Sequence, residues 1–217
     1  MKMLCLGDSY TIGEGVNETQ TWPNQLIKQL ENEQIKIARC DVIAKTGWTT
    51  NDLNQAINKF SSAPHYDLVT LSIGVNNQYQ GIDIQTYKIE FTHLLKNAIR
   101  FANNNPAHVL VISIPGYEKT SFASDTNNLL QRKEKYSRIQ DMTADEIGRS
   151  IDQYNHAAQQ IISEMNAANS AKISFIDITP ITREKAGLTT RDGLHPSAEM
   201  YQEWVKLILP YVNKIRF

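Results

Sequence analysis

Short apolar runs, most of them containing β-branched residues, alternate along this chain with longer amphipathic stretches, and the alternation restricts the folds it can adopt. The apolar runs are Met3–Leu6, Ile35–Ile43, Leu68–Ile73, Val109–Ile114 and Ile173–Ile178. Stretches with helical spacing follow them at Trp22–Leu30, Asp52–Phe60, Ile84–Ala102, Ala144–Asn166 and Ser197–Val212. Strands that are hydrophobic throughout are typical of parallel sheets covered by helices on both faces. The sequence therefore predicts an α/β fold, a three-layer α/β/α sandwich around a mostly five-stranded parallel sheet with right-handed crossovers.

The size and charge of the chain limit the number of its domains and the class of protein to which it can belong. Its 217 residues suffice for one well-buried core, so we expect a single domain over residues 1–217. With 41% hydrophobic residues and a net charge of -1, the chain has the composition of a soluble globular protein, which argues against nucleic acid as a partner. No apolar run approaches the roughly 20 residues that span a membrane. If Met1 is the native start, the absence of a secretory signal predicts a cytoplasmic protein.

The two cysteines carry no functional signal. Cys5 and Cys40 both lie in apolar, strand-like stretches, which predicts buried free thiols. Neither has a histidine or a second cysteine at metal-ligand spacing. We therefore expect no metal site. The sequence leaves the oligomeric state open.

Polar residues and glycines follow the predicted strands. Ser9 comes after the first strand, Gly47 after the second and Asn76 after the third, while Asp192 and His195 precede the last helix. The carboxyl ends of parallel strands share one edge of the sheet, where functional groups gather. We expect these residues to meet there.

These residue types match the requirements of acyl transfer by a serine. The Ser9 hydroxyl needs a base to take its proton, which His195 can do, and Asp192 can orient the imidazole. The N–H groups of Ser9 and Gly47 and the side-chain amide of Asn76 can form an oxyanion hole. The sequence thus supplies a nucleophile, a base, an orienting carboxylate and oxyanion donors.

The same blocks resemble those of a known family. Gly7-Asp8-Ser9, Gly47, Gly74-Val75-Asn76 and Asp192-Gly193-Leu194-His195 look like the four motif blocks of the SGNH hydrolases, also called GDSL esterases and lipases, in the family's order. The resemblance implies a flavodoxin-like three-layer fold and hydrolysis of acyl esters without a cofactor. It also implies the roles named above for Ser9, Gly47, Asn76, Asp192 and His195.

The chain departs from the family pattern at one position. The third block commonly reads Gly-x-Asn-Asp, whereas this chain has Asn77 in the last place. Because the expected oxyanion donor is Asn76, we expect the change to alter local hydrogen bonding more than catalysis. Gly47 has a second interpretation, a glycine required only by a turn.

The substrate pocket is expected to be lined by Tyr79 and Tyr117, which lie within a few residues of predicted strand ends. The segment 117–143 lacks strand character, mixes apolar with charged residues and follows the fourth strand. It is interpreted either as a lid or pocket wall, with a short helix around Asn127–Lys135, or as a solvated loop.

Two classes of function remain open. The first is a serine esterase or deacylase that hydrolyses a small or medium acyl ester, such as an acetyl or short-chain ester of a carbohydrate, lipid or aryl alcohol, through an acyl-Ser9 intermediate. Thioesters and lysophospholipids suit the same chemistry. The second is a non-catalytic, flavodoxin-like ligand-binding module. A phosphate-binding loop is absent, and Thr11 stands where the α/β-hydrolase nucleophile elbow needs glycine.

Overall fold

A five-stranded parallel sheet forms the centre of the protein in a computed structural model that describes residues 1–59, 65–125, 142–168 and 170–215. Its strands are β1 Lys2–Asp8, β2 Arg39–Lys45, β3 Leu68–Ser72, β4 Val109–Ile112 and β5 Ser174–Ile176. They lie in the order β2-β1-β3-β4-β5, with every neighbouring pair parallel. This is the flavodoxin-like order. The predicted fold class is confirmed.

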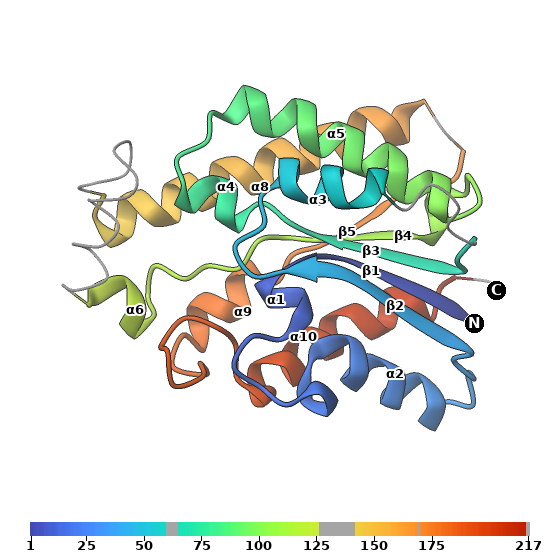
Figure 1. Cartoon of the computed structure of the whole chain (residues 1–217), viewed down its shortest axis with the longest axis horizontal. Coiled ribbons are helices and arrows are strands. Elements are labelled where there is room, and N and C mark those ends of the chain that lie inside the picture. The colour runs from blue at the N-terminus through green and yellow to red at the C-terminus, as the bar shows by residue number, and fades with distance from the viewer. Residues whose placement is uncertain (60–64, 126–141, 169, 216–217) are drawn as a thin grey trace.

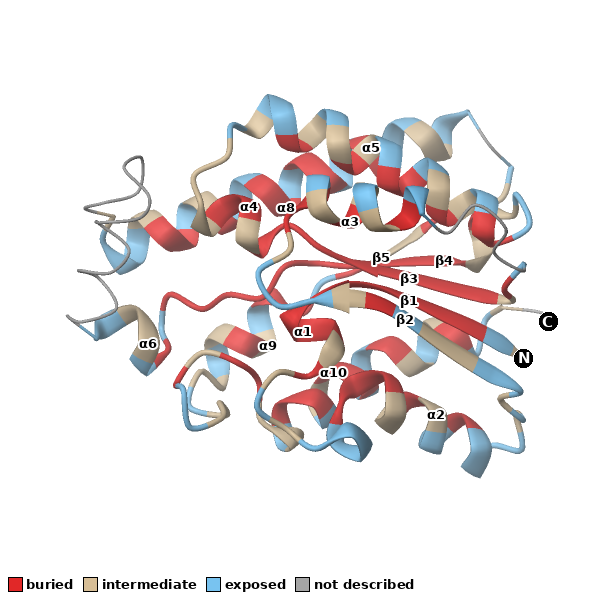
Figure 2. Cartoon of the chain, in the orientation of Figure 1, coloured by how far each residue is buried: buried red, intermediate tan, exposed pale blue. Residues whose placement is uncertain are grey.

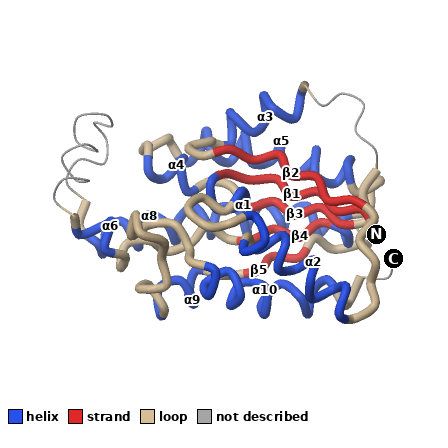
Figure 3. The backbone as a smooth tube through the Cα atoms, turned by 60° about the horizontal axis from the view of Figure 1, so that its bottom comes forward, coloured by secondary structure: helices blue, strands red, loops and turns tan. Residues whose placement is uncertain are grey.

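Helices cover both faces of the sheet and complete the three layers (Figure 1). Their bounds are α1 Ser9–Ile12, α2 Trp22–Asn32, α3 Thr50–Asn58, α4 Val75–Tyr79, α5 Ile84–Phe101, α6 Ser121–Ser124, α8 Ala144–Ala167, α9 Thr179–Glu184 and α10 Ala198–Val212. The helices α3, α5 and α8 pack on one face, and α2 and α10 pack on the other. Figure 3 shows the sheet between these two layers.

Local sequence signals explain where several helices begin. Thr49 before α3 and Thr143 before α8 each form a capping box, with Asp52 and Glu146 as the reciprocal partners. The last helix is also capped, since Ser197 Oγ accepts the Met200 N–H at 3.4 Å. These caps satisfy backbone N–H groups that a helix leaves without partners at its start.

The burial of the strands follows their position in the sheet (Figure 2). All residues of β3 and β4 are buried, as are those of β1 apart from Lys2. The strand β2 lies at the edge and has only Ile43 buried, while Val42 is 46% exposed. The continuous apolar runs in the sequence therefore correspond to strands covered on both faces.

The second strand begins later than its apolar run predicts. Ile35 and Ile37 precede β2 and pack against the core as part of the connection from α2. The Ile35 N–H donates to Leu30 O at 2.9 Å, which holds this connection against the end of α2. The ladder starts at Arg39 because its partner in β1 is Lys2, at the beginning of that strand. Hydrophobicity alone thus marks a buried segment without fixing its strand boundary.

The carboxyl ends of the strands form one rim of the molecule, on the left in Figure 1, and the N-terminus lies at the other side. The loops that lead into α1, α3 and α4 leave from this rim. The chain order reverses between β1 and β3, and ligands in open parallel sheets bind beside such a reversal. None of the helices in the described parts of the chain is long and apolar enough to span a membrane.

Candidate active site

Ser9 lies at the junction between β1 and α1. The strand ends at Asp8, whose carboxylate accepts the Tyr10 N–H at 3.0 Å and caps the short helix that begins with Ser9. Ser9 is buried, with 3% of its surface exposed. Backbone N–H groups in the first turn of a helix have no acceptor within it. The Ser9 N–H lies in the first turn of α1 and so has no acceptor within that helix.

Asp192 and His195 lie together in the loop before α10. His195 Nδ1 is 2.6 Å from Asp192 Oδ2, and the His195 backbone N–H donates to Asp192 Oδ1 at 3.0 Å. Gly193 between them adopts φ +70, a backbone conformation that residues with a side chain rarely adopt. The backbone angle therefore favours glycine at this position.

The Asp192 carboxylate is surrounded by donors. Its Oδ1 accepts from Thr190 Oγ1 at 2.8 Å, from the Leu194 N–H at 2.8 Å and from the His195 N–H. Partial burial acts to raise the pKa of Asp192, but the hydrogen bonds from His195 and the two backbone N–H groups outweigh it and lower that pKa to about 2. Asp192 is therefore an anionic acceptor at neutral pH.

Tyr10 links the serine to the histidine loop. Its ring lies 5.2 Å from the His195 ring and 6.3 Å from the Trp204 ring, centroid to centroid. Its carbonyl oxygen accepts a hydrogen bond from Tyr201 Oη at 3.0 Å. Since Tyr201 and Trp204 belong to α10, these contacts hold α1 against the helix that follows His195.

The predicted oxyanion donors come from two neighbouring loops. Gly47 follows β2 and adopts φ +81, and a Cβ at this position would have no atom within 4 Å, so the backbone angle rather than space requires glycine. Asn76 lies in α4 after β3, and its Nδ2 donates to Trp48 O at 3.0 Å. This bond ties the two loops together and leaves a second Nδ2–H on Asn76 for a ligand.

A cavity of about 170 Å³ brings the predicted residues together. It is lined by Ser9, Gly47, Asn76, Tyr79, Tyr117 and His195, with Tyr10, Thr46, Val75, Phe122 and Leu194 completing its wall. Asp192 lies behind His195, outside the lining. Among the described residues there is no hydrogen bond between Ser9 Oγ and the His195 ring, and such pairs often tighten only when substrate binds.

The two predicted pocket tyrosines are part of an aromatic cluster. The Tyr79 ring lies 6.3 Å from that of Tyr117 and 6.2 Å from that of Phe122. Tyr117 Oη donates to Gln78 Oε1 at 2.9 Å, which fixes its ring in the wall. Sequence reasoning does not single out Phe122 or Leu194 as pocket residues. Phe122 lies outside the four motif blocks, and Leu194 lies within the last block at a position to which the resemblance assigns no role.

Phe122 belongs to α6, near the start of the segment that the sequence allows to be either a lid or a solvated loop. Its N–H donates to Gly193 O at 3.2 Å, so this part of the segment is bonded to the loop that carries Asp192 and His195. Through Phe122, α6 therefore contributes to the wall of the cavity. The short helix predicted around Asn127–Lys135 lies outside the described residues.

Asp8, the residue before Ser9, is a buried acid. Burial raises the pKa of its carboxyl to about 7, although the N–H groups of Tyr10 and of Asp8 itself act to lower it. An unfolded Asp has a pKa near 4. The carboxyl thus binds its proton more tightly in the folded chain, and its contribution to stability is full below about pH 4 and lost as the pH rises through about 7.

We expect Asp8→Asn to remove this pH dependence. Asn caps a helix as well as Asp but does not ionise. Between about pH 5 and about pH 8 the wild type should lose more unfolding free energy than the variant, as measured by urea denaturation. An equal loss in both proteins would show that Asp8 does not titrate in this range.

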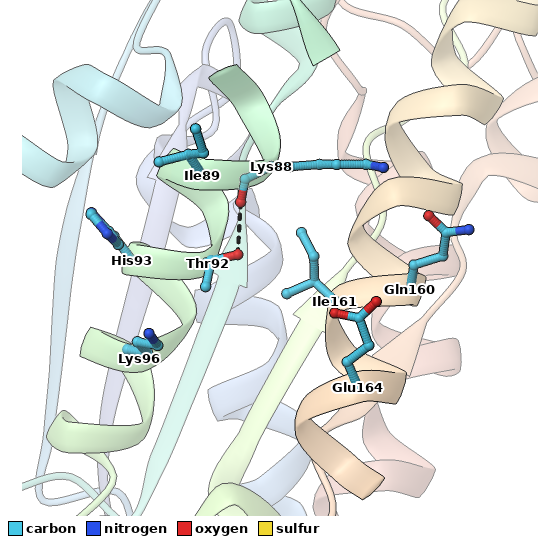
Figure 4. A pocket seen from close by; sticks show the side chains of 8 residues that line it. All are labelled: Lys88, Ile89, Thr92, His93, Lys96, Gln160, Ile161 and Glu164. Carbon is cyan, nitrogen blue, oxygen red and sulfur yellow. Dashed lines mark hydrogen bonds between the residues drawn. The ribbon is translucent and has the colours of Figure 1, made fainter. Parts of the chain in front are cut away.

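A second hollow, of about 340 Å³, lies between α5 and α8, away from the rim (Figure 4). Lys88 and Lys96 on α5 and Glu164 on α8 line it. The hydroxyl in its lining, Thr92 Oγ1, donates to Lys88 O of the same helix at 2.7 Å. Because this hydroxyl is bonded within the helix and the described lining residues include no aspartate–histidine pair, the hollow is not a candidate site for acyl transfer.

The described residues offer no cluster of three or more His, Cys, Asp or Glu side chains that could hold a metal ion. Both cysteines are free thiols, with Cys5 buried as predicted and Cys40 only partly buried because β2 is an edge strand. Neither thiol lines the cavity that contains Ser9.

Comparison with known structures shows the same fold across the whole chain. The structure named TesA has a TM-score of 0.69 and 15% identity, with 100% of both chains covered. Axe2, an acetylxylan esterase from Geobacillus stearothermophilus, has a TM-score of 0.68 and 17% identity, covering 97% of this chain and 93% of that one. The esterase EstA from Pseudoalteromonas sp. has a TM-score of 0.64 and 16% identity, covering 98% and 99%.

Comparison with protein families identifies the family of the chain, whereas the solved structures show its fold. No curated protein sequence matches the chain. The sequence model of the GDSL-like lipase/acylhydrolase family, in contrast, matches residues 5–203 and so includes every predicted site residue. That match and the shared fold agree with the resemblance of the four blocks. The chain therefore belongs to the GDSL-like lipase/acylhydrolase family and is a carboxylic ester hydrolase.

Proposed function

We propose that this protein is a serine esterase or deacylase that hydrolyses a small or medium acyl ester through an acyl-Ser9 intermediate, with His195 as base and Asp192 as its partner. The observation that carries the proposal is the shared cavity, in which Ser9, Gly47, Asn76 and His195 belong to one lining. The 2.6 Å bond between His195 Nδ1 and Asp192 supports the assignment of the base.

The hydrogen bonds of Asp192 define the tautomer of His195 in this proposal. An anionic carboxylate only accepts hydrogen bonds, so Nδ1, which lies beside Asp192 Oδ2, carries the ring proton. Nε2 of the neutral ring then has a free lone pair. It is the atom that takes the proton from Ser9 Oγ.

The reaction proceeds in two acyl transfers. Ser9 Oγ attacks the ester carbonyl while its proton moves to His195 Nε2, and the tetrahedral intermediate collapses when that proton passes to the leaving alcohol oxygen. Water then attacks the acyl-Ser9 carbonyl and gives a proton to His195 Nε2. His195 passes this proton to Ser9 Oγ as the acyl–oxygen bond breaks, which releases the acid. Every proton that His195 receives is returned within the cycle, so no cofactor is consumed.

The oxyanion of each intermediate is stabilised by donors from three loops. These are the N–H groups of Ser9 and Gly47 and the Nδ2–H of Asn76 that is not bonded to Trp48 O. Removing one such donor typically raises the barrier by about 2.7–4 kcal/mol. The φ of +81 at Gly47 serves both this role and the turn, so its two interpretations are compatible.

The cavity supports a small, uncharged acyl group. Its volume is only about 170 Å³. The described residues of its lining include no Asp, Glu, Lys or Arg, and its main surfaces are aromatic or aliphatic. Acetyl and other short acyl esters fit these properties, and the acetylxylan esterase among the similar structures makes acetylated carbohydrates one class to test.

A fluorophosphonate probe followed by peptide mapping tests the proposed nucleophile. We expect an adduct on Ser9 in the wild type, no adduct there in Ser9→Ala, and strongly slowed labelling in His195→Ala. Ser124→Ala, which changes an exposed serine of α6, should label like the wild type. A folded wild-type protein that acquires no adduct on Ser9 would contradict the proposal.

Tyr79 is expected to limit the acyl chain. Tyr79→Ala removes a partly exposed ring from the cavity wall and makes room for about two more methylenes, each worth about 0.8 kcal/mol on transfer from water. We therefore expect kcat/KM for a butanoate ester to rise roughly tenfold relative to that for acetate. The control Tyr211→Ala, on the distant part of α10, should keep the wild-type ratio. An unchanged ratio in Tyr79→Ala would show that this ring does not select the acyl group.

A further inference from the structure

The loops that carry Gly47 and Asn76 are joined by a second set of hydrogen bonds, next to the bond from Asn76 to Trp48. Asn77 Oδ1 accepts the backbone N–H of Thr50 at 2.9 Å, and Asn77 Nδ2 donates to Thr50 Oγ1 at 2.6 Å. Thr50 Oγ1 in turn donates to Glu90 Oε2 at 2.5 Å. These bonds connect α4, the first residue of α3 and the middle of α5.

The donor direction of this chain of hydrogen bonds follows from chemistry. A backbone N–H only donates, so the Asn77 atom beside it must be the carbonyl oxygen, and the amide nitrogen must face Thr50 Oγ1. The Thr50 hydroxyl therefore accepts from Asn77. Its own proton is left for the Glu90 carboxylate, which accepts. One arrangement of protons satisfies all three side chains.

The hydrogen-bond chain is shielded from water at its centre. Asn77 and Thr50 have 0% of their surface exposed, and Glu90 is partly buried. The Asn77 backbone carbonyl oxygen is also contacted by Tyr154 Oη of α8 at 3.4 Å. A mismatched donor or acceptor in such a place has no water to replace the lost partner, so its energetic penalty is large.

We propose that Asn77, Thr50 and Glu90 are positioning residues that hold the Gly47 loop and the Asn76 loop at the separation an oxyanion needs, and that Glu90 is what makes Asn rather than Asp the matching residue at position 77. The proposal rests on the proposed function in one respect, the oxyanion role of Gly47 and Asn76. It accounts for the departure from the usual Gly-x-Asn-Asp block by a compensating residue in another helix.

Asn77→Asp breaks the match between hydrogen-bond donors and acceptors among these three side chains. Both oxygens of the new carboxylate are acceptors, so the Thr50 hydroxyl has one proton for two carboxylates, the one at position 77 and that of Glu90. A change to Gln at position 90 restores the match with the direction reversed, because the Gln amide can donate to Thr50 Oγ1 while Thr50 donates to the carboxylate at position 77. Glu90→Gln alone is tolerated, since the Gln carbonyl oxygen can still accept from Thr50.

The test is a double-mutant cycle with Asn77→Asp, Glu90→Gln and both together. With an acetate ester, we expect Asn77→Asp to lower kcat about tenfold with KM within about twofold, which is the usual effect of one lost hydrogen bond to a charged group. Glu90→Gln should stay within about twofold of wild type, and the double variant should recover to within about threefold. Asn97→Asp is the matched control, because Asn97 Oδ1 accepts from Arg100 Nη2 at 3.2 Å on α5 and a carboxylate oxygen can accept there as well.

The outcomes separate this proposal from the proposed function. A double variant no better than Asn77→Asp, or a wild-type kcat in Asn77→Asp, overturns the proposal. If Asn77→Asp does not fold, Thr50→Val breaks the hydrogen-bond chain at its centre and should lower kcat in a way that Glu90→Gln does not repair; repair, or no loss, overturns it. If the wild type hydrolyses no ester, the proposed function fails. The melting temperatures of the same variants then test the positioning role: a melting temperature that recovers in the double variant supports the role, and one that does not recover overturns it.

Discussion

Ser9→Ala is expected to lower kcat for ester hydrolysis by about 10⁴-fold or more, because it removes the hydroxyl group that lines the same cavity as His195. His195→Ala should have a loss of the same order, since an unassisted serine hydroxyl is a weak nucleophile. In both variants KM should stay within a few-fold of the wild type, because the aromatic wall and the oxyanion donors remain.

The two losses should not add. In the proposed mechanism Ser9 and His195 act in the same proton transfer, so the double variant should be about as slow as either single one. Steady-state kinetics of the three variants on one acetate ester measure this. The matched control is His156→Ala, since His156 is an exposed histidine of α8. Substantial turnover in Ser9→Ala would assign the reaction to another group and remove the acyl-Ser9 intermediate from the mechanism.

The architecture could be predicted from the sequence because burial on both faces leaves a strong local signal. The runs at residues 3–6, 68–73 and 109–114 are apolar at nearly every position, and each overlaps a strand of the central sheet. The amphipathic stretches between them indicate crossovers, which in turn require parallel neighbours. The order of the strands could not be predicted from such signals, since no local pattern shows which strands are neighbours. Only the family resemblance implies it.

The site could be predicted as far as its residues lie in short motifs at strand ends. Ser9, Gly47 and Asn76 meet in one cavity with His195, as the shared edge of a parallel sheet predicts. Phe122 could not be assigned in this way, because its place depends on how α6 folds back onto the loop at Gly193.

Position 77 shows a different limit of sequence reasoning. The replacement of a carboxylate by an amide is visible in the sequence, and it leads to the expectation that local hydrogen bonds change. The partner that explains it, Glu90, lies in another helix and is reached through Thr50. Compensation of this kind depends on the direction of hydrogen bonds between distant residues, which only the folded structure displays.

Asp192→Asn is expected to lower kcat by about 10⁴-fold while leaving the fold intact, because it reverses the tautomer of His195. Three groups donate to Asp192 Oδ1, namely Thr190 Oγ1 and the N–H groups of Leu194 and His195. In the variant the amide oxygen must take this place, since an amide nitrogen cannot accept from them. The NH₂ group then faces His195 Nδ1 and donates to it, so the ring proton moves to Nε2, the atom that accepts the Ser9 proton in the proposed mechanism.

Kinetics and ¹⁵N NMR of the imidazole test this argument together. We expect the neutral ring of the wild type to carry its proton on Nδ1 and that of Asp192→Asn to carry it on Nε2. The matched control is Asp83→Asn, because Asp83 is an exposed cap of α5 that accepts from Gln85 and Thr86 and that Asn can replace. A variant with the Nε2 tautomer and undiminished kcat would separate Asp192 from catalysis. Low kcat with the wild-type tautomer would instead assign the loss to the missing charge beside the imidazolium that forms during the reaction.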